Sequence, residues 1–318
     1  MNTNLEPQSP VLTLSRNIRL INWGLVLLIV AITGVGIALL YSAAGGRWEP
    51  WAMRQSVRFI PGFAIMLTIA VIDVRIWLRF AYGIYGVMFC LLIAVEGMGQ
   101  VGMGAQRWID LGFFVIQPSE LMKPALVLAL ARYFHGLTLD QIGRPLMLIP
   151  PMGLVFLPVG LVLLQPNLGT ALLLIFTGAA IFWCAGVRLW KFATAIGGGL
   201  AAIPIGWEFL HDYQKARVFN FLDPERDPLG SGYNIIQSKI ALGSGGLFGK
   251  GFMLGSQSQL QFLPEKHTDF IFVVLAEEFG MVGALFLLGL YMLVFVYGIV
   301  ITLSCRNHFG RLVGIGLT

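Results

Sequence analysis

The sequence has few charged residues and few cysteines for its length. Asp, Glu, Lys and Arg make up 12% of its 318 residues, whereas soluble domains average about 25%. Hydrophobic residues make up 57%, and the mean hydropathy is +0.80. A chain of this composition cannot cover its surface with polar side chains, so a soluble globular domain is excluded. We therefore expect an integral membrane protein.

Cysteine and histidine are too sparse and scattered to indicate a disulfide framework or a metal site. Cys90, Cys184 and Cys305 lie far apart, and the four histidines show none of the spacings typical of zinc ligands. The sequence has no internal repeat of about 20 to 50 residues and no low-complexity tract. We therefore expect a single domain over residues 1–318 and propose no metal site.

Long apolar runs are abundant, and their lengths indicate transmembrane helices. A helix needs about 20 apolar residues to cross the hydrocarbon core of a bilayer. The runs predict eight full spans and the start of a ninth, at 20–41, 56–73, 78–96, 117–134, 145–164, 169–187, 189–208, 269–303 and from Leu312. The predicted fold is all-α and polytopic, with a tail over 1–18 and a large polar loop over 208–268.

Basic residues are unevenly distributed between alternate loops. Lys and Arg in short loops are retained on the cytoplasmic side of a membrane. With the N-terminus inside, the inner set is Arg16, Arg19, Arg75, Arg79, Arg132, Arg144, Arg188, Lys191, Arg306 and Arg311, and the short outer loops hold Arg47, Arg54, Arg58 and Arg107. The tail is then cytoplasmic and the large loop extracytoplasmic. The net charge of +5 reflects topology and does not indicate nucleic-acid binding.

The large loop contains a glycine-rich segment, Gly243–Gly251, that invites comparison with phosphate-binding loops. Its spacing differs from that of a P-loop, because Ser244 stands in place of the first glycine and Gly251 in place of the magnesium-binding Ser or Thr. Two interpretations stay open. The segment is either a close-packed turn or an anion-binding backbone for a lipid pyrophosphate, with Lys239 or Lys250 supplying the charge.

Polar and aromatic residues also gather around the start of the fourth predicted span. Glu120 and Lys123 are three residues apart and share one helix face, as either a structural ion pair or a substrate-facing pair. A charge at membrane depth costs about 2.5–3.5 kcal/mol on insertion scales, so it needs a reason to be there. Trp108 is typical of an interfacial anchor, and Arg107 suits a lipid phosphate or a substrate pyrophosphate.

The densest group of charges lies where the large loop enters the last full span. Ionisable residues cluster over 265–269, and Glu277 and Glu278 follow two turns deeper in the same predicted helix. In an ordinary alternative, Thr268 or Asp269 caps the helix, a role worth about 1 kcal/mol. A cap needs fewer charges than are present, so Asp269 is the candidate catalytic carboxylate. Glu277 and Glu278 are expected to pack or form ion pairs inside the bundle.

Several separated motifs together resemble the SEDS family of membrane glycosyltransferases, and its rod-shape branch more than its division branch. The resemblance runs from about Leu25 to the end of the chain. The motifs that carry it are Gly104–Trp108, Gln117–Glu120, Gln165–Thr170, Asp223–Gly230, Gln237–Gly246 and Leu263–Phe270. Each motif is weak alone, but their order along the chain is specific.

The resemblance implies a peptidoglycan glycosyltransferase of the bacterial cytoplasmic membrane with an outward-facing active site. Such an enzyme polymerises lipid II: the 4-hydroxyl of one N-acetylglucosamine attacks C1 of the donor's N-acetylmuramic acid, and undecaprenyl pyrophosphate leaves with inversion. The reaction needs a base for the hydroxyl and positive charge for the leaving group. Asp269 matches the family's essential carboxylate and is the candidate base. The candidate substrate-binding residues are Glu120, Lys123, Arg107, Trp108, Arg217, Lys239, Lys250, Gln237 and His267.

The resemblance also implies a partner, a class B penicillin-binding protein that supplies transpeptidation. It leaves a divalent cation, Mg²⁺ or Mn²⁺, open as an aid to the leaving group, although no ligand cluster in the sequence indicates one. Two other functions stay open. Intramembrane charges would also suit a lipid II flippase, and a non-catalytic scaffold of the cell-wall machinery is the third.

Two features depart from the family pattern. Asn167 stands where the family often has Asp, which puts a required carboxylate there in doubt. The family has about ten spans and a further motif near its end, whereas this sequence stops at Thr318. The resemblance therefore predicts a C-terminally truncated form and leaves its activity open.

Overall fold

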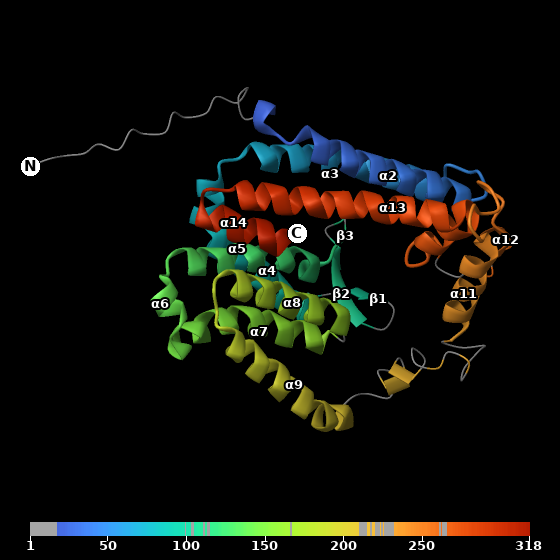
Figure 1. The fold of residues 1–318 in the computed structure, drawn as a ribbon. Coiled ribbons are helices and arrows are strands. Elements are labelled where there is room, and N and C mark those ends of the chain that lie inside the picture. The colour runs from blue at the N-terminus through green and yellow to red at the C-terminus, as the bar shows by residue number, and fades with distance from the viewer. Residues whose placement is uncertain are drawn as a thin grey trace, which may run out of the picture. The chain divides into compact units, whose positions relative to one another are not determined.

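The computed structural model describes residues 18–318 except 99, 103–104, 111, 113–114, 166, 210–214, 217, 220–222, 224, 226–231, 261 and 263–265 (Figure 1). Most of the described residues are helical. The long helices are α2 (Trp23–Ala43), α3 (Trp51–Val71), α4 (Val74–Met98), α5 (Pro118–His135), α7 (Ile149–Leu164), α8 (Leu168–Cys184), α9 (Leu189–Phe209) and α13 (Ile271–Ser304). The shorter ones are α6 (Leu139–Ile142), the 3-10 helix η1 (Pro145–Leu148), α11 (Tyr233–Gly245), α12 (Ser256–Gln259) and α14 (His308–Leu317).

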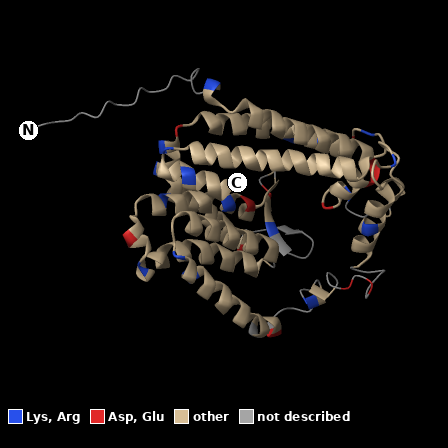
Figure 2. Ribbon diagram, in the orientation of Figure 1, with Lys and Arg blue, Asp and Glu red and all other residues tan. Residues whose placement is uncertain are grey.

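The predicted spans all correspond to helices, and the all-α membrane fold is confirmed. Within the described chain, four helical segments are long and apolar enough to cross a membrane, namely Trp23–Ala43, Val74–Gly97, Pro145–Leu164 and Ile271–Ser304. Leu168–Cys184 is a shorter apolar helix. Charged residues are sparse along the long helices (Figure 2). Those inside α3 and α5, such as Arg58 and Lys123, lower the hydropathy of these two predicted spans.

The chain divides into two compact units, of which the first comprises Met1–Ile72 and Pro204–Val294. In this unit α2 packs on α3, and Leu39 of α2 forms a buried cluster with Leu275 and Leu287 of α13. Ala241 of α11 packs against Val273 of α13. The beginning of α13, which follows Asp269 directly, is therefore held by both α2 and α11.

The second unit comprises Asp73–Ile203 and Phe295–Thr318. Its core is built around α5, which packs on α4, α7, α8 and α14. Leu126, Leu130 and Phe134 of α5 are fully buried there with Ile181 of α8 and Phe309 of α14. Pro118 occupies the first turn of α5, where proline is tolerated because the amides there have no helical partners.

A small antiparallel sheet lies between α4 and α5, where the sequence predicted only a loop. It contains β1 (Gln100–Gly102), β2 (Ala105–Asp110) and β3 (Val115–Ile116) in the order β1-β2-β3. Gln100 pairs with Trp108, and Ile109 pairs with Ile116. Strands of two to six residues are too short for an alternation pattern to identify them. Their ladder places Arg107 and Trp108 on a regular backbone.

Helix α13 is interrupted at Gly280, which has φ 65° and ψ −163°. An unbroken helix would pair the carbonyls of Glu277 and Glu278 with amides four residues later. Here the glycine-rich segment supplies the partners instead. The bonds are Lys250 N to Glu277 O (3.1 Å), Gly251 N to Glu278 O (2.9 Å), Met281 N to Gly246 O (2.9 Å) and Val282 N to Leu247 O (3.1 Å). Backbone groups in a membrane span must be satisfied within the protein, and this exchange satisfies four of them.

Candidate functional site

Asp269 lies in an exposed turn directly before α13. At the start of the helix, the amides of Ile271 and Val273 donate to the main-chain carbonyls of Thr268 and Phe270 (3.4 and 3.0 Å). Main-chain groups therefore satisfy amides that a side-chain cap would otherwise serve. The Asp269 carboxylate is exposed and can meet a substrate.

The residues just before Asp269 are anchored to α3 and α12. The ring of His267 stacks on Trp51 of α3, with centroids 4.5 Å apart and planes 3° apart. Lys266 Nζ donates to the carbonyl of Ser258 (2.6 Å) and lies 6.0 Å from the Trp51 ring. Burial lowers the pKa of the Lys266 ammonium group from its ordinary value. The exposed carboxylate is thus carried by a fixed segment.

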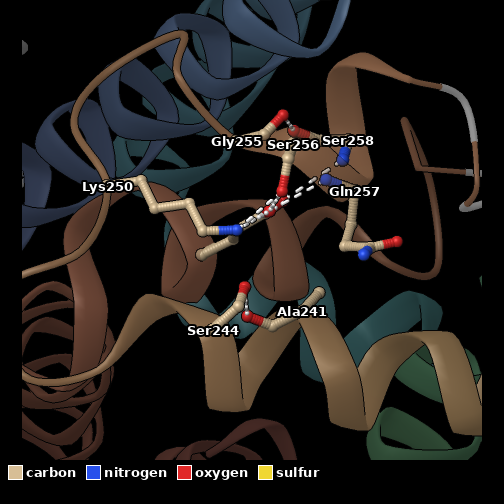
Figure 3. Close-up of polar contacts among 8 residues, drawn as sticks. Ala241, Ser244, Lys250, Gly255, Ser256, Gln257 and Ser258 are labelled. Atoms are coloured by element: carbon tan, nitrogen blue, oxygen red, sulfur yellow. Dashed lines mark hydrogen bonds and ion pairs between the residues drawn. The ribbon is translucent and has the colours of Figure 1, made fainter.

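Glu277 is fully buried and ion-paired, as expected from the sequence. Its carboxylate lies 2.9 Å from Lys250 Nζ, whose side chain is 29% exposed. Lys250 Nζ also donates to Ser256 Oγ at 2.7 Å (Figure 3). Three further donors point at the same carboxylate. They are Ser256 Oγ (3.3 Å) and Gln257 N (2.9 Å) on Oε1, and Ser258 N (3.2 Å) on Oε2. Both oxygens are therefore hydrogen-bonded, as a buried charge requires.

Glu278 is also fully buried but has a different environment. Ser42 Oγ of α2 donates a hydrogen bond to its Oε1. The backbone amide of Met253 interacts with the same carboxyl group, while Oε2 lacks a hydrogen-bond partner in the part of the chain that the structure describes. The carbonyl of Ser42 accepts from Gln259 Nε2 (2.9 Å), so α2, α12 and α13 are joined by polar contacts.

The glycine-rich segment is a close-packed turn against α13. A Cβ on Gly249 would lie 2.1 Å from the carbonyl oxygen of Glu278, which leaves room for glycine alone. The amides of Lys250 and Gly251 donate to main-chain carbonyls of α13, and Lys250 Nζ forms an ion pair with the Glu277 carboxylate. This geometry favours the packing interpretation over an anion-binding backbone.

The remaining candidates of the large loop are placed as follows. Gln237 and Lys239 lie on α11, where Gln237 is half-buried and Lys239 is exposed. Arg217 lies outside the described residues. Within the first unit the structure thus brings His267 to the Asp269 turn and Lys250 to the buried Glu277. No group of three or more His, Cys, Asp or Glu that could hold a metal occurs among the described residues.

The candidates of the second unit fall into two local pairs. Glu120 and Lys123 form an ion pair of 2.8 Å at the start of α5, with side chains 51% and 27% exposed. Arg107 Nε of β2 donates to the carbonyl of Gln165 (3.0 Å), and the neighbouring Trp108 is exposed. The Asn167 side chain accepts from Thr170 N (3.3 Å) and caps α8, a role that Asn fills as well as Asp.

Sequence reasoning missed Trp51 and Ser42. Trp51 begins α3 and is aromatic at a predicted membrane boundary, a signal that could have marked it as an anchor. Its partner His267 is more than two hundred residues away in sequence. Ser42 lies inside an apolar helix and carries no signal of its contact with Glu278.

The chain matches a known protein family and is similar to a characterised member of it. Residues 17–318 match a family described as cell cycle proteins, which comprises FtsW, RodA and SpoVE. The chain is 43% identical over 301 residues to the peptidoglycan glycosyltransferase MrdB of Escherichia coli K12. That match covers 92% of this chain and 79% of MrdB.

Solved structures are similar as well. One is a chain of a peptidoglycan synthase complex that coordinates polymerization and crosslinking, with TM-score 0.79, 34% identity, and coverage of 93% of this chain and 82% of that chain. Another is the rod shape determining protein RodA of Thermus thermophilus, with TM-score 0.67, 31% identity, and coverage of 93% and 80%.

Proposed function

Because this chain belongs to the FtsW, RodA and SpoVE family and is a peptidoglycan glycosyltransferase, we propose that it polymerises lipid II with Asp269 as the general base. The exposed carboxylate of Asp269, on a turn fixed by Trp51 and Ser258, is the observation that carries the proposal. The likeness to MrdB and to RodA supports the rod-shape branch of the family.

In the proposed reaction Asp269 accepts the proton of the acceptor's 4-hydroxyl as its oxygen attacks C1 of the donor sugar. The bond between that oxygen and C1 forms while the bond from C1 to the pyrophosphate oxygen breaks. Undecaprenyl pyrophosphate leaves with the bonding electron pair, and the carboxylic acid then releases the proton to water. Base assistance of this kind is typically worth about 10²–10⁴-fold in rate.

The leaving pyrophosphate needs positive charge in the same reaction. Lys239 on α11 is exposed, and we propose it as a source of this charge in the large loop. Arg217 lies outside the described residues and stays a prediction. Glu120, Lys123, Arg107 and Trp108, which lie in the second unit, stay predictions as substrate-binding residues. Lys250 is assigned to the ion pair with Glu277.

The proposed setting is the outer face of the bacterial cytoplasmic membrane. The chain is a multi-pass membrane protein, and the bias of its basic residues supports an extracytoplasmic large loop. The likeness to a chain of a peptidoglycan synthase complex supports a class B penicillin-binding protein as partner.

One assay distinguishes this function from its alternatives. Purified protein in detergent is incubated with fluorescent lipid II, and the products are separated by electrophoresis. A polymerase yields glycan strands, whereas a flippase needs a sealed bilayer to show activity and a scaffold shows none. Absence of strands from folded protein, together with lipid II transfer across vesicles, would overturn the proposal.

A further inference from the structure

We infer that Glu277 is a positioning residue that holds the turn carrying Asp269. The inference rests on the proposed role of Asp269 and extends it to a buried carboxylate without substrate contact. Glu277 lies eight residues after Asp269 in the sequence, which is about two helical turns. It is fully buried, so it acts through other groups.

The first link runs from Glu277 to the segment 255–258. Its carboxylate accepts from the backbone amides of Gln257 and Ser258, at 2.9 and 3.2 Å. A Cβ on Gly255 would lie 2.8 Å from Glu277 Oε2, which shows how closely the backbone approaches the carboxylate. The backbone of the segment 255–258 is therefore in direct contact with the Glu277 side chain.

The second link runs from that segment to the Asp269 turn. The carbonyl of Ser258 accepts from Lys266 Nζ at 2.6 Å. Next to Lys266, the His267 ring stacks on Trp51 at 4.5 Å. Glu277 thus holds the Asp269 turn from one side through Ser258 and Lys266, and from the other side through α13 itself.

Both links depend on the charge and shape of Glu277. Its two oxygens act only as acceptors, and four donors converge on them, including the ammonium group of Lys250. A glutamine of the same size would turn an N–H group toward at least one of these donors. Glu278, by contrast, is tied to Ser42 of α2 and has no hydrogen bond to the segment 255–258 among the described residues.

The test compares Glu277→Gln with wild type and with Asp269→Asn, each purified in detergent micelles. The first readout is hydrogen–deuterium exchange of backbone amides over 256–260 and 266–270. The second is kcat and KM for lipid II polymerisation. Glu96→Gln is the matched control, because Glu96 is an exposed glutamate near the end of α4 in the other unit.

We expect Glu277→Gln to speed exchange over 256–260 and 266–270 by at least about tenfold and to lower kcat by about 10²-fold, the cost of a misplaced catalytic group. KM should change less than about threefold, because Glu277 makes no substrate contact. Asp269→Asn should lower turnover by about 10²–10⁴-fold and keep the wild-type exchange rate, and Glu96→Gln should match wild type in both readouts.

The outcomes separate the two proposals. If Glu277→Gln shows wild-type exchange over 256–260 and 266–270, the positioning role is overturned, whatever the activity of the variant. Full turnover in Asp269→Asn overturns the proposed role of Asp269 as the base. The exchange rates of Glu277→Gln then still decide whether Glu277 holds the turn. If Glu277→Gln does not fold, Lys266→Met decides by the same two readouts, because it removes the bond to Ser258 without leaving a buried charge unpaired.

Discussion

At the scale of single residues, two ion pairs of nearly equal length differ in burial. Lys250–Glu277 measures 2.9 Å with a fully buried carboxylate, and Lys123–Glu120 measures 2.8 Å with a half-exposed one. Lys250→Met leaves a buried charge unpaired, so we expect it to lower the free energy of unfolding by about 3 kcal/mol. Lys123→Met should cost no more than about 1 kcal/mol, because the pair is solvated.

Unfolding in mixed detergent micelles measures both changes. The double variant Glu277→Gln with Lys250→Met serves as a further control, because it removes both charges and should recover part of the loss. Equal effects of Lys250→Met and Lys123→Met would contradict the assigned difference in burial.

Residue pairs close in sequence could be predicted, and distant ones could not. The three-residue spacing of Glu120 and Lys123 identified their pair, because helix geometry fixes such neighbours. Lys250 is 27 residues from Glu277, and Ser42 is 236 residues from Glu278. Those partners depend on tertiary packing. The sequence therefore indicated that Glu277 would be paired but did not show which residue would pair with it.

At the scale of elements, the break in α13 depends on Gly280. Its φ of 65° disfavours any residue with a side chain, and a Cβ there would lie 2.4 Å from Gly249 N. We expect Gly280→Ala to lower the free energy of unfolding by at least about 2 kcal/mol, from backbone strain and overpacking together. Thermal unfolding followed by size-exclusion chromatography measures the effect.

Gly289→Ala is the matched control within the same helix. A Cβ on Gly289 would meet nothing within 4 Å, and Ala is the better helix former. This variant should be neutral or stabilising by up to about 1 kcal/mol. A Gly280→Ala protein as stable as the Gly289→Ala protein would show that the break is dispensable.

Helices were predictable from this sequence, but their interruptions and the small sheet were not. A run of apolar residues predicts a span regardless of whether one glycine inside it leaves the helical region. The break at Gly280 is visible only once the glycine-rich segment is seen to replace its hydrogen bonds. β1, β2 and β3 are likewise defined by pairing with each other rather than by local pattern.

At the scale of the whole molecule, the proposed topology places Asp269 and Cys305 on opposite sides of the membrane. The helix α13 between them spans Ile271–Ser304. We expect a membrane-impermeant maleimide to label Thr268→Cys in intact cells, in a background with Cys90, Cys184 and Cys305 replaced by serine. Cys305 as sole cysteine should be labelled only after permeabilisation. Labelling in the reverse order would contradict the topology inferred from the basic residues.

The central claim is that Asp269 is the base of lipid II polymerisation, and one measurement tests it most directly. The initial rate of glycan strand formation is compared for wild type, Asp269→Asn and Asp269's matched control Asp140→Asn, an exposed aspartate at the start of α6. We predict that Asp269→Asn loses about 10²–10⁴-fold in rate with unchanged thermal stability, because the side chain is exposed, and that Asp140→Asn keeps the wild-type rate. A near-wild-type rate for folded Asp269→Asn would contradict the role of Asp269 as the base.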